Sequence, residues 1–237
     1  MSDLIDTTEM YLKTVYELIE EDIPPMRARI AERLGHSGPT VSQTVARLER
    51  DGLMVVTSDR HLQLTEEGTR RATQVMRKHR LAERLLTDVI GLDWPYVHDE
   101  ACRWEHVMSD QVERRLVSLL GAPQHDPYGN PIPGLGALGV EEPEHVVVIP
   151  LSDLAGPDSG SSDLDGEGAR SVRLERIGEP LQVDVELLQE FFDAGIAPPT
   201  PVRVTFEGDD LLLSADERSD AVRLPAQFGK HLFIRRP

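Results

Sequence analysis

The fold is indicated most clearly by residues 27–50, which read RARIAERLGHSGPTVSQTVARLER. Apolar side chains recur at helical spacing on both sides of a glycine-rich turn, as expected for two short helices. Ser37 can cap the second helix, and Pro39 fits its first turn because proline is tolerated there. We therefore predict helices over residues 26–34 and 39–51, arranged as a helix-turn-helix.

The sequence on either side of this motif predicts a complete winged helix. Apolar side chains at helical spacing over residues 3–21 indicate a first helix before the motif. Residues 53–56 and 62–64 are strand-like and flank a polar turn, which predicts a two-stranded hairpin after the motif. Three short helices followed by a small hairpin form the winged helix-turn-helix pattern.

The second helix of the motif and the residues around it suit contacts with double-stranded DNA. Short polar side chains lie at its N-terminal end, which enters the major groove, and arginine side chains can bind phosphate oxygens. A helix-turn-helix can also serve packing alone, but the adjoining wing favours DNA binding. The candidate DNA contacts are Thr7, Arg27, Ser37, Pro39, Thr40, Ser42, Gln43, Arg47, Arg50 and Arg60.

The charge of the whole chain argues against a nucleic-acid partner, but its distribution weakens that argument. The formal net charge is −17 and the sequence pI is about 4.8. Residues 120–237 contain 9 Lys and Arg against 21 Asp and Glu, so most of the acidic excess lies in the second half. Phosphate affinity depends on local positive charge more than on the sum over the chain. The arginines around the motif therefore remain compatible with DNA binding.

The chain has a single cysteine and no long apolar run. One cysteine excludes a disulfide within the chain and fits a reducing compartment. No segment is apolar enough over a sufficient length to span a bilayer, and the N-terminus lacks the residue order of a signal peptide. We therefore expect a cytoplasmic protein with no membrane partner.

Beyond the winged helix, the pattern is first helical and then rich in strand-like runs. Middle helices are expected over residues 65–90, 98–106 and 109–120. After residue 140, strand-like runs surround a helix at residues 185–195 and predict a small β-barrel-like domain. A segment rich in Gly, Ser and Asp predicts an acidic flexible insert at about residues 151–169. The expected architecture is an α+β chain with domains at residues 1–73, 74–140 and 141–237.

Several side chains of metal-ligand type occur on the expected middle helices. A spacing of four residues places His79 and Glu83 on one face of the long helix. The same spacing places His98 and Cys102 on one face of the next. Mixed nitrogen, oxygen and sulfur donors suit divalent first-row transition metals. The candidate ligands are His79, Glu83, His98, Cys102, Glu105 and His106.

Two other interpretations of these residues are weaker. A buried histidine beside a glutamate is more often structural than a ligand, but several ligand-type residues in helical phase favour a metal site. Cys102 and His106 resemble a nucleophile and its base, yet no oxyanion-hole loop or glycine-rich elbow accompanies them. We therefore expect that the protein is not an enzyme.

Longer stretches of the sequence resemble a known family. The chain closely resembles the diphtheria toxin repressor family, especially its actinobacterial iron-dependent regulators, almost continuously over residues 1–140. The stretches that carry this resemblance are Asp6–Leu12, Arg27–Leu34, Ser37–Val45, Met76–Leu86, His98–Met108 and Gly129–Gly134. Residues 179–182 and 192–195 resemble the SH3-like third domain of the family.

The resemblance implies an architecture and two Fe²⁺ sites in each chain. A winged helix-turn-helix DNA-binding domain would precede a helical dimerisation and metal-binding domain and a C-terminal SH3-like small β-barrel. The implied regulatory site consists of Met10, Cys102, Glu105 and His106, with the carbonyl of Cys102. The implied ancillary site consists of His79, Glu83, His98, Glu179 and Gln182.

The resemblance also implies an Fe²⁺-activated repressor of iron acquisition and storage genes. A metal would bridge the N-terminal helix to the dimerisation domain and favour binding of homodimers, one or two on each site, to a palindromic operator. Co²⁺, Ni²⁺, Mn²⁺ and Zn²⁺ would substitute for iron. A manganese-responsive regulator of the same family and a metal-independent winged-helix regulator remain alternatives.

One position departs from the family pattern. The family has a serine that can hold an anion together with an asparagine and an arginine. Asn130 and Arg80 are present in this chain, but Asp126 stands at the serine position. A carboxylate there argues against an anion site, because like charges repel.

Overall fold

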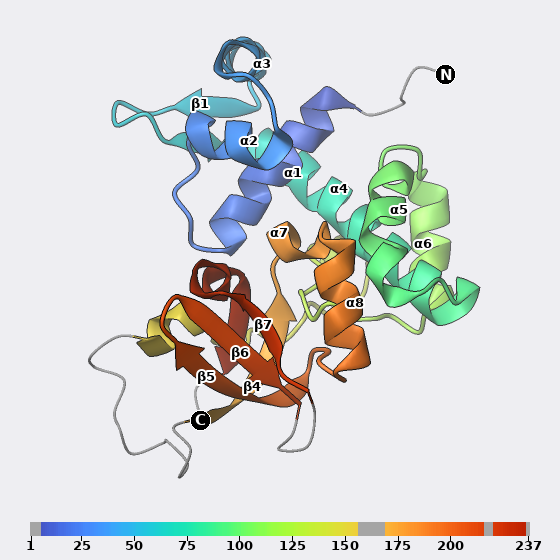
Figure 1. Ribbon diagram of the computed structural model, residues 1–237. Coiled ribbons are helices and arrows are strands. Elements are labelled where there is room, and N and C mark those ends of the chain that lie inside the picture. Colours follow the sequence, from blue (N-terminus) through green and yellow to red (C-terminus); the bar gives the residue numbers. More distant parts are fainter. Residues whose placement is uncertain (1–5, 156–168, 216–219, 236–237) are drawn as a thin grey trace. The chain divides into compact units, whose positions relative to one another are not determined.

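The computed structural model describes residues 6–155, 169–215 and 220–235 (Figure 1). The chain forms two compact units, and each contains segments that are far apart in the sequence. Unit 1 comprises Met1–Ala82, Glu100–Pro123 and Ile132–Glu142. Unit 2 comprises Glu83–Asp99, Gln124–Pro131 and Pro143–Pro237.

Unit 1 begins with the winged helix that the sequence predicts. Its elements are α1 (Thr7–Glu20), α2 (Arg27–Leu34), α3 (Gly38–Arg50), β1 (Met54–Val56) and β2 (Leu62–Leu64). Asp6 caps α1 because its carboxylate accepts a hydrogen bond from the backbone N–H of Thr8 at 2.7 Å. Gly35 ends α2 in the left-handed conformation, and Ser37 caps α3. The two strands pair antiparallel, so the predicted wing is confirmed.

The core of the winged helix collects the apolar stripe of each helix. Tyr11, Ile30, Val45 and Leu48 are fully buried and lie in one hydrophobic cluster. Truncating a buried leucine to alanine usually costs about 2–5 kcal/mol, so Leu48 alone can hold a large part of the stability of this region. The apolar spacing that predicts these helices therefore also identifies their buried faces.

The middle helices begin and end at residues that differ slightly from those predicted from the sequence. The long helix α4 (Glu66–Leu85) continues as a short π-helix over Leu86–Ile90, and Gly91 then adopts a left-handed conformation. The helix α5 spans Val97–Trp104, and Ser109 caps α6 (Asp110–Leu119). Gly68 near the start of α4 is required because a Cβ there would lie 1.9 Å from the carbonyl oxygen of Leu53.

The prediction of a single helix over residues 98–106 is wrong at its C-terminal end. Glu105 and His106 lie in a turn after α5. The chain turns here because the carbonyl oxygen of Trp104 accepts hydrogen bonds from the backbone N–H groups of both Val107 and Met108, each at 3.2 Å. The backbone N–H of Glu105 still donates to the carbonyl of Ala101 at 3.0 Å, so helical hydrogen bonding extends to Glu105 although the helix ends at Trp104.

Unit 2 is built on a six-stranded antiparallel sheet with the strand order β3-β8-β4-β5-β6-β7 (Figure 1). Its strands are β3 (Ile149–Pro150), β4 (Arg170–Ile177), β5 (Thr200–Glu207), β6 (Asp210–Ser214), β7 (Val222–Pro225) and β8 (Leu232–Arg235). Inward-facing residues pair across the sheet, as Val172 does with Val202 and Val204 with Leu213. The predicted strand-rich C-terminal region is confirmed, although β7 is not among the predicted strands.

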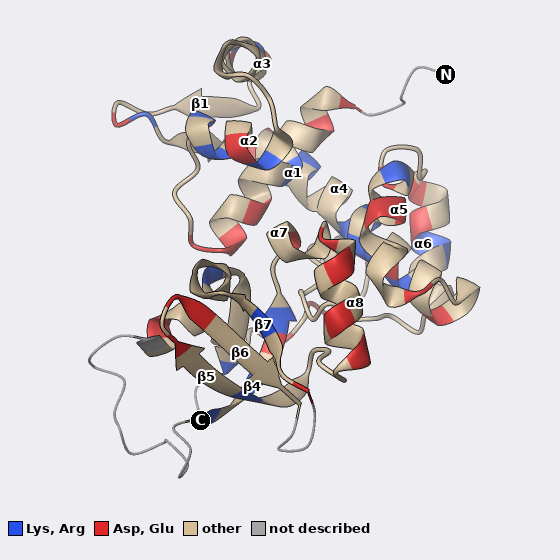
Figure 2. Cartoon of the chain, viewed as in Figure 1, with Lys and Arg blue, Asp and Glu red and all other residues tan. Residues whose placement is uncertain are grey.

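Two helices accompany the sheet. The short helix α7 (Glu179–Gln182) follows β4 directly, and α8 (Val185–Asp193) corresponds to the predicted helix at residues 185–195. Acidic residues are spaced along α8, at Glu186, Glu190 and Asp193 (Figure 2). The buried faces of α7 and α8 include Leu181, Leu188 and Phe191. The position of α7 at the end of β4 brings Glu179 into the candidate site below.

The predicted acidic insert is only partly within the described residues. Residues 151–155, at the start of the predicted insert, form a short 3₁₀ helix in which Leu151 is fully buried. This segment is ordered because it packs closely on Gly229, where an added Cβ would lie 3.2 Å from the backbone nitrogen of Ser152. The remainder, residues 156–168, lies outside the described residues. None of the described helices is long and apolar enough to cross a membrane.

Candidate metal centre

A polar cluster in unit 1 joins α1 to α4 and to the end of α5. We call it the unit 1 cluster, and it consists of Glu9, Lys13, His79, Cys102, Glu105 and His106. Sequence separations between contacting members reach 97 residues, so tertiary packing alone assembles the group. Three of its members are predicted ligands of the regulatory site.

The ammonium group of Lys13 lies close to three polar atoms of different kinds. Its Nζ is 3.1 Å from Glu105 Oε2, 3.6 Å from Cys102 Sγ and 3.3 Å from His79 Nδ1. Lys13 is only 5% exposed, so water contributes little to the solvation of this charge. The cluster thus places a cation beside a carboxylate and a thiol, with the His79 ring next to it.

Glu105 connects the remaining members. Its Oε2 lies 2.6 Å from His79 Nδ1, and its Oε1 lies 3.1 Å from His106 Nε2. The other ring nitrogen of His106, Nδ1, lies 2.7 Å from Glu9 Oε2 on α1. The pairs Lys13–Glu105 and Glu9–His106 therefore link the first helix of the winged helix directly to the turn after α5.

Electrostatics favour the ionised form of Glu105 despite its burial. Burial disfavours the carboxylate, but the positive charge of Lys13 and the nearby His79 outweigh it and hold the pKa of Glu105 below its ordinary value. Burial also disfavours the charged form of His106. The hydrogen bond with Glu9 and the charge of Glu105 outweigh that effect and raise the pKa of His106 above its ordinary value.

Met10, the fourth predicted regulatory ligand, lies on α1 and is half-buried. It packs against the core of the winged helix, and its carbonyl oxygen accepts a hydrogen bond from Thr14 Oγ1 at 2.9 Å. Glu9 and Lys13, which flank it, were not predicted from the sequence. A usable signal exists, since the four-residue spacing of Glu9 and Lys13 places both on one helical face beside buried residues such as Leu12.

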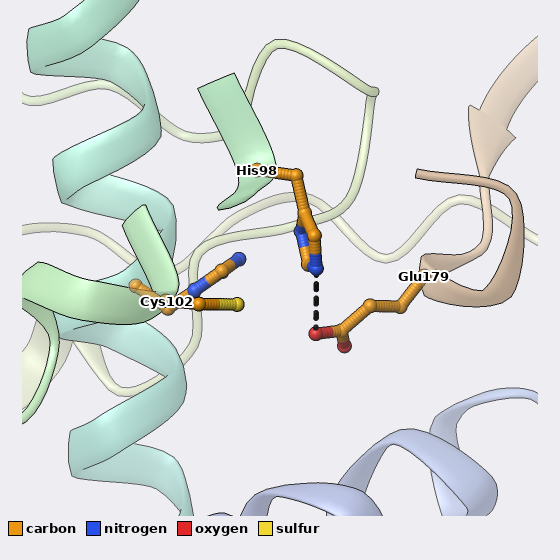
Figure 3. A group of neighbouring side chains, drawn as sticks. His98, Cys102 and Glu179 are labelled. Atoms are coloured by element: carbon orange, nitrogen blue, oxygen red, sulfur yellow. Dashed lines mark ion pairs between the residues drawn. The ribbon is translucent and has the colours of Figure 1, made fainter. Parts of the chain in front are cut away.

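A second group of ligand-type residues lies in unit 2. We call Glu83, His98, Glu179 and Gln182 the unit 2 cluster. His98 Nδ1 is 3.3 Å from Glu83 Oε1, and His98 Nε2 is 3.5 Å from Glu179 Oε1 (Figure 3). Glu83 is fully buried and His98 nearly so. One imidazole ring therefore lies between two carboxylates.

The loop over residues 124–131 positions α7 for this cluster. The carbonyl oxygen of Ile177, at the end of β4, accepts hydrogen bonds from Asn130 Nδ2 at 3.0 Å and from Gln182 Nε2 at 2.7 Å. The backbone N–H of Ile177 in turn donates to the carbonyl of Tyr128 at 2.9 Å. Because its amide nitrogen is engaged, Gln182 offers its amide oxygen as a donor for a cation.

The predicted ancillary residues are divided between the two units. Glu83, His98, Glu179 and Gln182 belong to unit 2, whereas His79 belongs to unit 1 and contacts Glu105 and Lys13. Glu83 follows His79 by one turn of α4, as the sequence predicts. Both sets of residues remain predictions as metal ligands.

The loop also shows what replaces the serine expected at position 126. Asp126 is buried, and its carboxylate accepts hydrogen bonds from the backbone N–H groups of Tyr128 and Asn130 at 2.8 and 2.9 Å. Asn130 Nδ2 adds a third at 3.0 Å. Arg80, in unit 1, forms its own ion pair with Glu20 at 2.5 Å. Asp126 and Asn130 therefore hydrogen-bond to one another, and the loss of an anion site beside them remains a prediction.

The donor chemistry of both clusters fits a divalent transition metal. The unit 1 cluster offers sulfur, nitrogen and oxygen atoms, and it already stabilises a positive charge at Lys13. The unit 2 cluster offers an imidazole and two carboxylates. Nitrogen, oxygen and sulfur donors of this kind bind first-row divalent metals in proteins, and thiolates favour the softer ones.

The predicted DNA contacts lie on and around α3. Ser37 Oγ lies 2.8 Å from Thr40 Oγ1, so the cap holds the exposed N-terminal turn of the helix in place. The side chains on the outer face of α3 are exposed, whereas Val41 and Val45 face the core. Among the candidates, Thr7, Ser37, Pro39, Thr40, Ser42, Gln43, Arg50 and Arg60 are exposed, and Arg27 and Arg47 are half-buried.

Comparison with known proteins agrees with this architecture. Residues 3–62 match the family model described as iron dependent repressor, N-terminal DNA binding domain. Residues 65–134 match a second family model, which is described as iron dependent repressor, metal binding and dimerisation domain. A manganese-dependent transcriptional repressor in complex with manganese has a TM-score of 0.75 at 26% identity, over 97% of this chain and 99% of that one.

Similar sequences cover most of the chain. The diphtheria toxin repressor of Corynebacterium glutamicum is 57% identical over 210 residues, which are 87% of this chain and 87% of that protein. The iron-dependent repressor IdeR of Mycobacterium tuberculosis is 53% identical over 212 residues, which are 86% of each. This chain belongs to the iron-dependent repressor family.

Proposed function

We propose that this protein is an Fe²⁺-activated transcriptional repressor of genes for iron acquisition and storage. The observation that carries the proposal is the unit 1 cluster, which links α1 of the winged helix to the turn after α5 through Lys13–Glu105 and Glu9–His106. A cation held there would stabilise one position of the DNA-reading helices. Relatives named diphtheria toxin repressor and iron-dependent repressor, at 57% and 53% identity, support the assignment to iron.

The proposed metal content is two ions per chain. Met10, Cys102, Glu105 and His106, with the carbonyl of Cys102, would hold the regulatory ion, and His79, Glu83, His98, Glu179 and Gln182 would hold the ancillary one. Each ion supplies a positive charge that ligands from separate segments share. Co²⁺, Ni²⁺, Mn²⁺ and Zn²⁺ bind the same donor types and would substitute for Fe²⁺.

The residues of the chain account for activation as a shift between states. Ligands on α1 and in the turn after α5 bind an ion well only when the two segments are held together. The ion therefore favours that state by its higher affinity for it, and operator binding is coupled to metal binding. Removal of iron would then release the operator. The protein belongs to a family of DNA-binding repressors and performs no catalysis.

The DNA complex is proposed in more detail than the family alone provides. The protein is a homodimer that binds an operator, as its DNA-binding and dimerisation domains indicate. We propose that the operator is palindromic and takes two dimers, and that the exposed residues of α3 read the bases. We also propose three domains, at residues 1–73, 74–140 and 141–237. The proposed location is the cytoplasm.

A mobility-shift titration with a palindromic operator tests the proposal. Anaerobic Fe²⁺ should tighten binding by wild type, and a chelator should reverse the shift. Met10→Ala should lose most of this metal response, because it removes a ligand on α1. Val147→Ala is a suitable control, since Val147 is exposed and lies outside both clusters and outside the matched dimerisation domain at residues 65–134. Equal operator affinity of wild type with Fe²⁺ and with chelator would contradict the proposal.

The second candidate is a manganese-responsive regulator of the same family. The solved structure of a manganese-dependent transcriptional repressor resembles the fold of this chain. Against it stands Cys102, because thiolate ligands favour softer metals than Mn²⁺, which prefers carboxylates and water. Titration of operator binding with Mn²⁺ and Fe²⁺ at equal free concentrations separates the two: a stronger response to Mn²⁺ would favour the second candidate.

A further inference from the structure

We propose that Lys13 is a built-in competitor for the regulatory metal. Its ammonium group occupies the cation position of the unit 1 cluster when no metal is bound, and a divalent ion binds there only when the ammonium leaves. This inference rests on the proposed function, because it concerns regulation of the same site. It assigns to Lys13 the role of setting the metal concentration at which the protein responds.

The contacts of Lys13 are the first argument. Its Nζ lies 3.1 Å from Glu105 Oε2 and 3.6 Å from Cys102 Sγ, which are two of the proposed regulatory donors. A third contact, at 3.3 Å, is with His79 Nδ1. An ammonium group donates three hydrogen bonds and accepts none, so at Glu105 and Cys102 it engages lone pairs that a metal requires. His79 Nδ1 lies 2.6 Å from Glu105 Oε2 and donates its proton to that carboxylate.

Burial and charge make joint occupancy unfavourable. Lys13 and Glu105 are 5% and 3% exposed, so water screens little of the interaction between charges inside the cluster. Metal–oxygen bonds are about 2.0–2.2 Å long, which would bring a divalent ion onto the same carboxylate oxygen as the ammonium. Two cations sharing one buried oxygen repel strongly, so one of them must leave.

The structure also offers Lys13 another partner. Glu17 lies one turn further along α1, and its Oε1 is 4.0 Å from Lys13 Nζ. The lysine side chain has a flexible four-carbon stem, so its ammonium can move toward Glu17 while the stem stays buried. The exchange of ammonium for metal therefore requires a change of rotamer without unfolding of α1.

Two measurable consequences follow from this competition. Replacing Lys13 with a neutral side chain should destabilise the metal-free protein, because Glu105 loses its nearest fixed positive charge. The same change should tighten metal binding, because the ion no longer displaces a partner. A residue that only supports the site would give the opposite sign for metal affinity, so the two effects together distinguish competition from support.

The experiment compares Lys13→Met with wild type by Co²⁺ titration, using the absorption that Co²⁺ acquires when it is bound by the Cys102 thiolate. We expect about tenfold tighter Co²⁺ binding, and in EDTA a melting temperature several degrees lower than that of wild type. Lys13→Arg retains a cation, so its Co²⁺ affinity should stay closer to that of wild type than the affinity of Lys13→Met does. Lys78→Met is the control, because Lys78 pairs with Asp110 at 3.0 Å outside the cluster and should leave Co²⁺ affinity unchanged.

The outcomes separate this inference from the proposed function. Absence of the thiolate absorption in wild type would contradict the proposed function itself. Normal absorption in wild type with unchanged or weaker Co²⁺ affinity in Lys13→Met would overturn the competition. If Lys13→Met does not fold, Lys13→Gln keeps a polar side chain without the charge and serves the same comparison, with the same sign expected.

Discussion

The two clusters of ligand-type residues differ in how their charges are balanced. In the unit 1 cluster, the carboxylate of Glu105 contacts the ammonium of Lys13 and two imidazoles. In the unit 2 cluster, the ring of His98 lies between the carboxylates of Glu83 and Glu179. The first cluster therefore places a lysine ammonium beside a carboxylate, whereas the second places a titratable ring between two carboxylates.

This difference suggests different roles for the two proposed ions. In the unit 1 cluster, the Lys13–Glu105 pair is one link between α1 and the turn after α5. A metal that displaces the ammonium would replace this link with bonds to ligands on both segments. In the unit 2 cluster, a bound cation would interact favourably with the carboxylates of both Glu83 and Glu179. We therefore expect the unit 2 cluster to act mainly through local order around α7, and the unit 1 cluster to control DNA binding.

The largest effect is expected for Glu105→Ala. This change removes a proposed ligand and leaves Lys13 buried without its carboxylate, so metal-dependent operator affinity should fall at least about 100-fold. Breaking a buried ion pair from one side typically costs about 3–5 kcal/mol, so the metal-free protein should also lose stability by that order. Operator titration and chemical denaturation in EDTA measure the two effects.

A double variant provides the control for this prediction. Adding Lys13→Met to Glu105→Ala removes the unpaired ammonium, so the double variant should be more stable than Glu105→Ala alone. It should still lack the metal response, because the ligand is absent in both. Equal stability of the single and double variants would mean that Lys13 and Glu105 do not depend on one another, and the contrast between the clusters would be lost.

His98→Ala should have a smaller effect on DNA binding and a clear effect on metal content. The change leaves Glu83 and Glu179 without the ring between them, and the proposed second ion should no longer bind. Equilibrium dialysis against Co²⁺ should then give about half the wild-type content, while metal-dependent operator affinity falls only about tenfold. A loss of operator binding as large as that of Glu105→Ala would show that both clusters control the DNA-binding helix α3 equally.

Much of the fold could be predicted because its signals are local. The helix-turn-helix follows from apolar spacing, the cap at Ser37 and the left-handed Gly35, all within a few residues of one another. The end of α5 at Trp104 and the strand β7 were harder to predict from the sequence. The turn after α5 depends on which N–H groups the Trp104 carbonyl accepts, and β7 has only four residues, whose strand form depends on pairing with β6.

The site was less predictable, because long-range packing decides which charged residues are buried. Spacing identified Cys102, and the resemblance added Met10. Lys13 looks like an ordinary surface lysine in the sequence, yet its partners His79 and Glu105 are 66 and 92 positions away. Their approach buries it. The four-residue spacing of Glu9 and Lys13 places both on one face of α1, but it does not show which distant residues that face contacts.

Asn130→Ala tests whether the unit 2 cluster depends on the loop behind α7. Asn130 Nδ2 bridges Asp126 Oδ2 and the carbonyl of Ile177, each at 3.0 Å. Its loss leaves buried oxygen atoms with fewer donors, so stability should fall by about 1–3 kcal/mol. Affinity for the second Co²⁺ should weaken severalfold, while the Co²⁺–thiolate absorption titrates as in wild type. A change in that absorption would show that the loop also influences the unit 1 cluster.

The smallest effect is expected for Glu9→Gln. Glu9 Oε2 lies 2.7 Å from His106 Nδ1, and a carboxylate in that position orients the ring and increases its basicity as a ligand. The Glu9 side chain is 37% exposed, so solvent screens the pair, and Co²⁺ affinity should fall only about threefold. Glu9→Asp retains the charge on a shorter side chain, so it distinguishes the effect of the charge from the effect of side-chain length. If Glu9→Gln instead abolished the thiolate absorption, Glu9 would itself be a ligand, and the unit 1 cluster would hold its ion with two carboxylates.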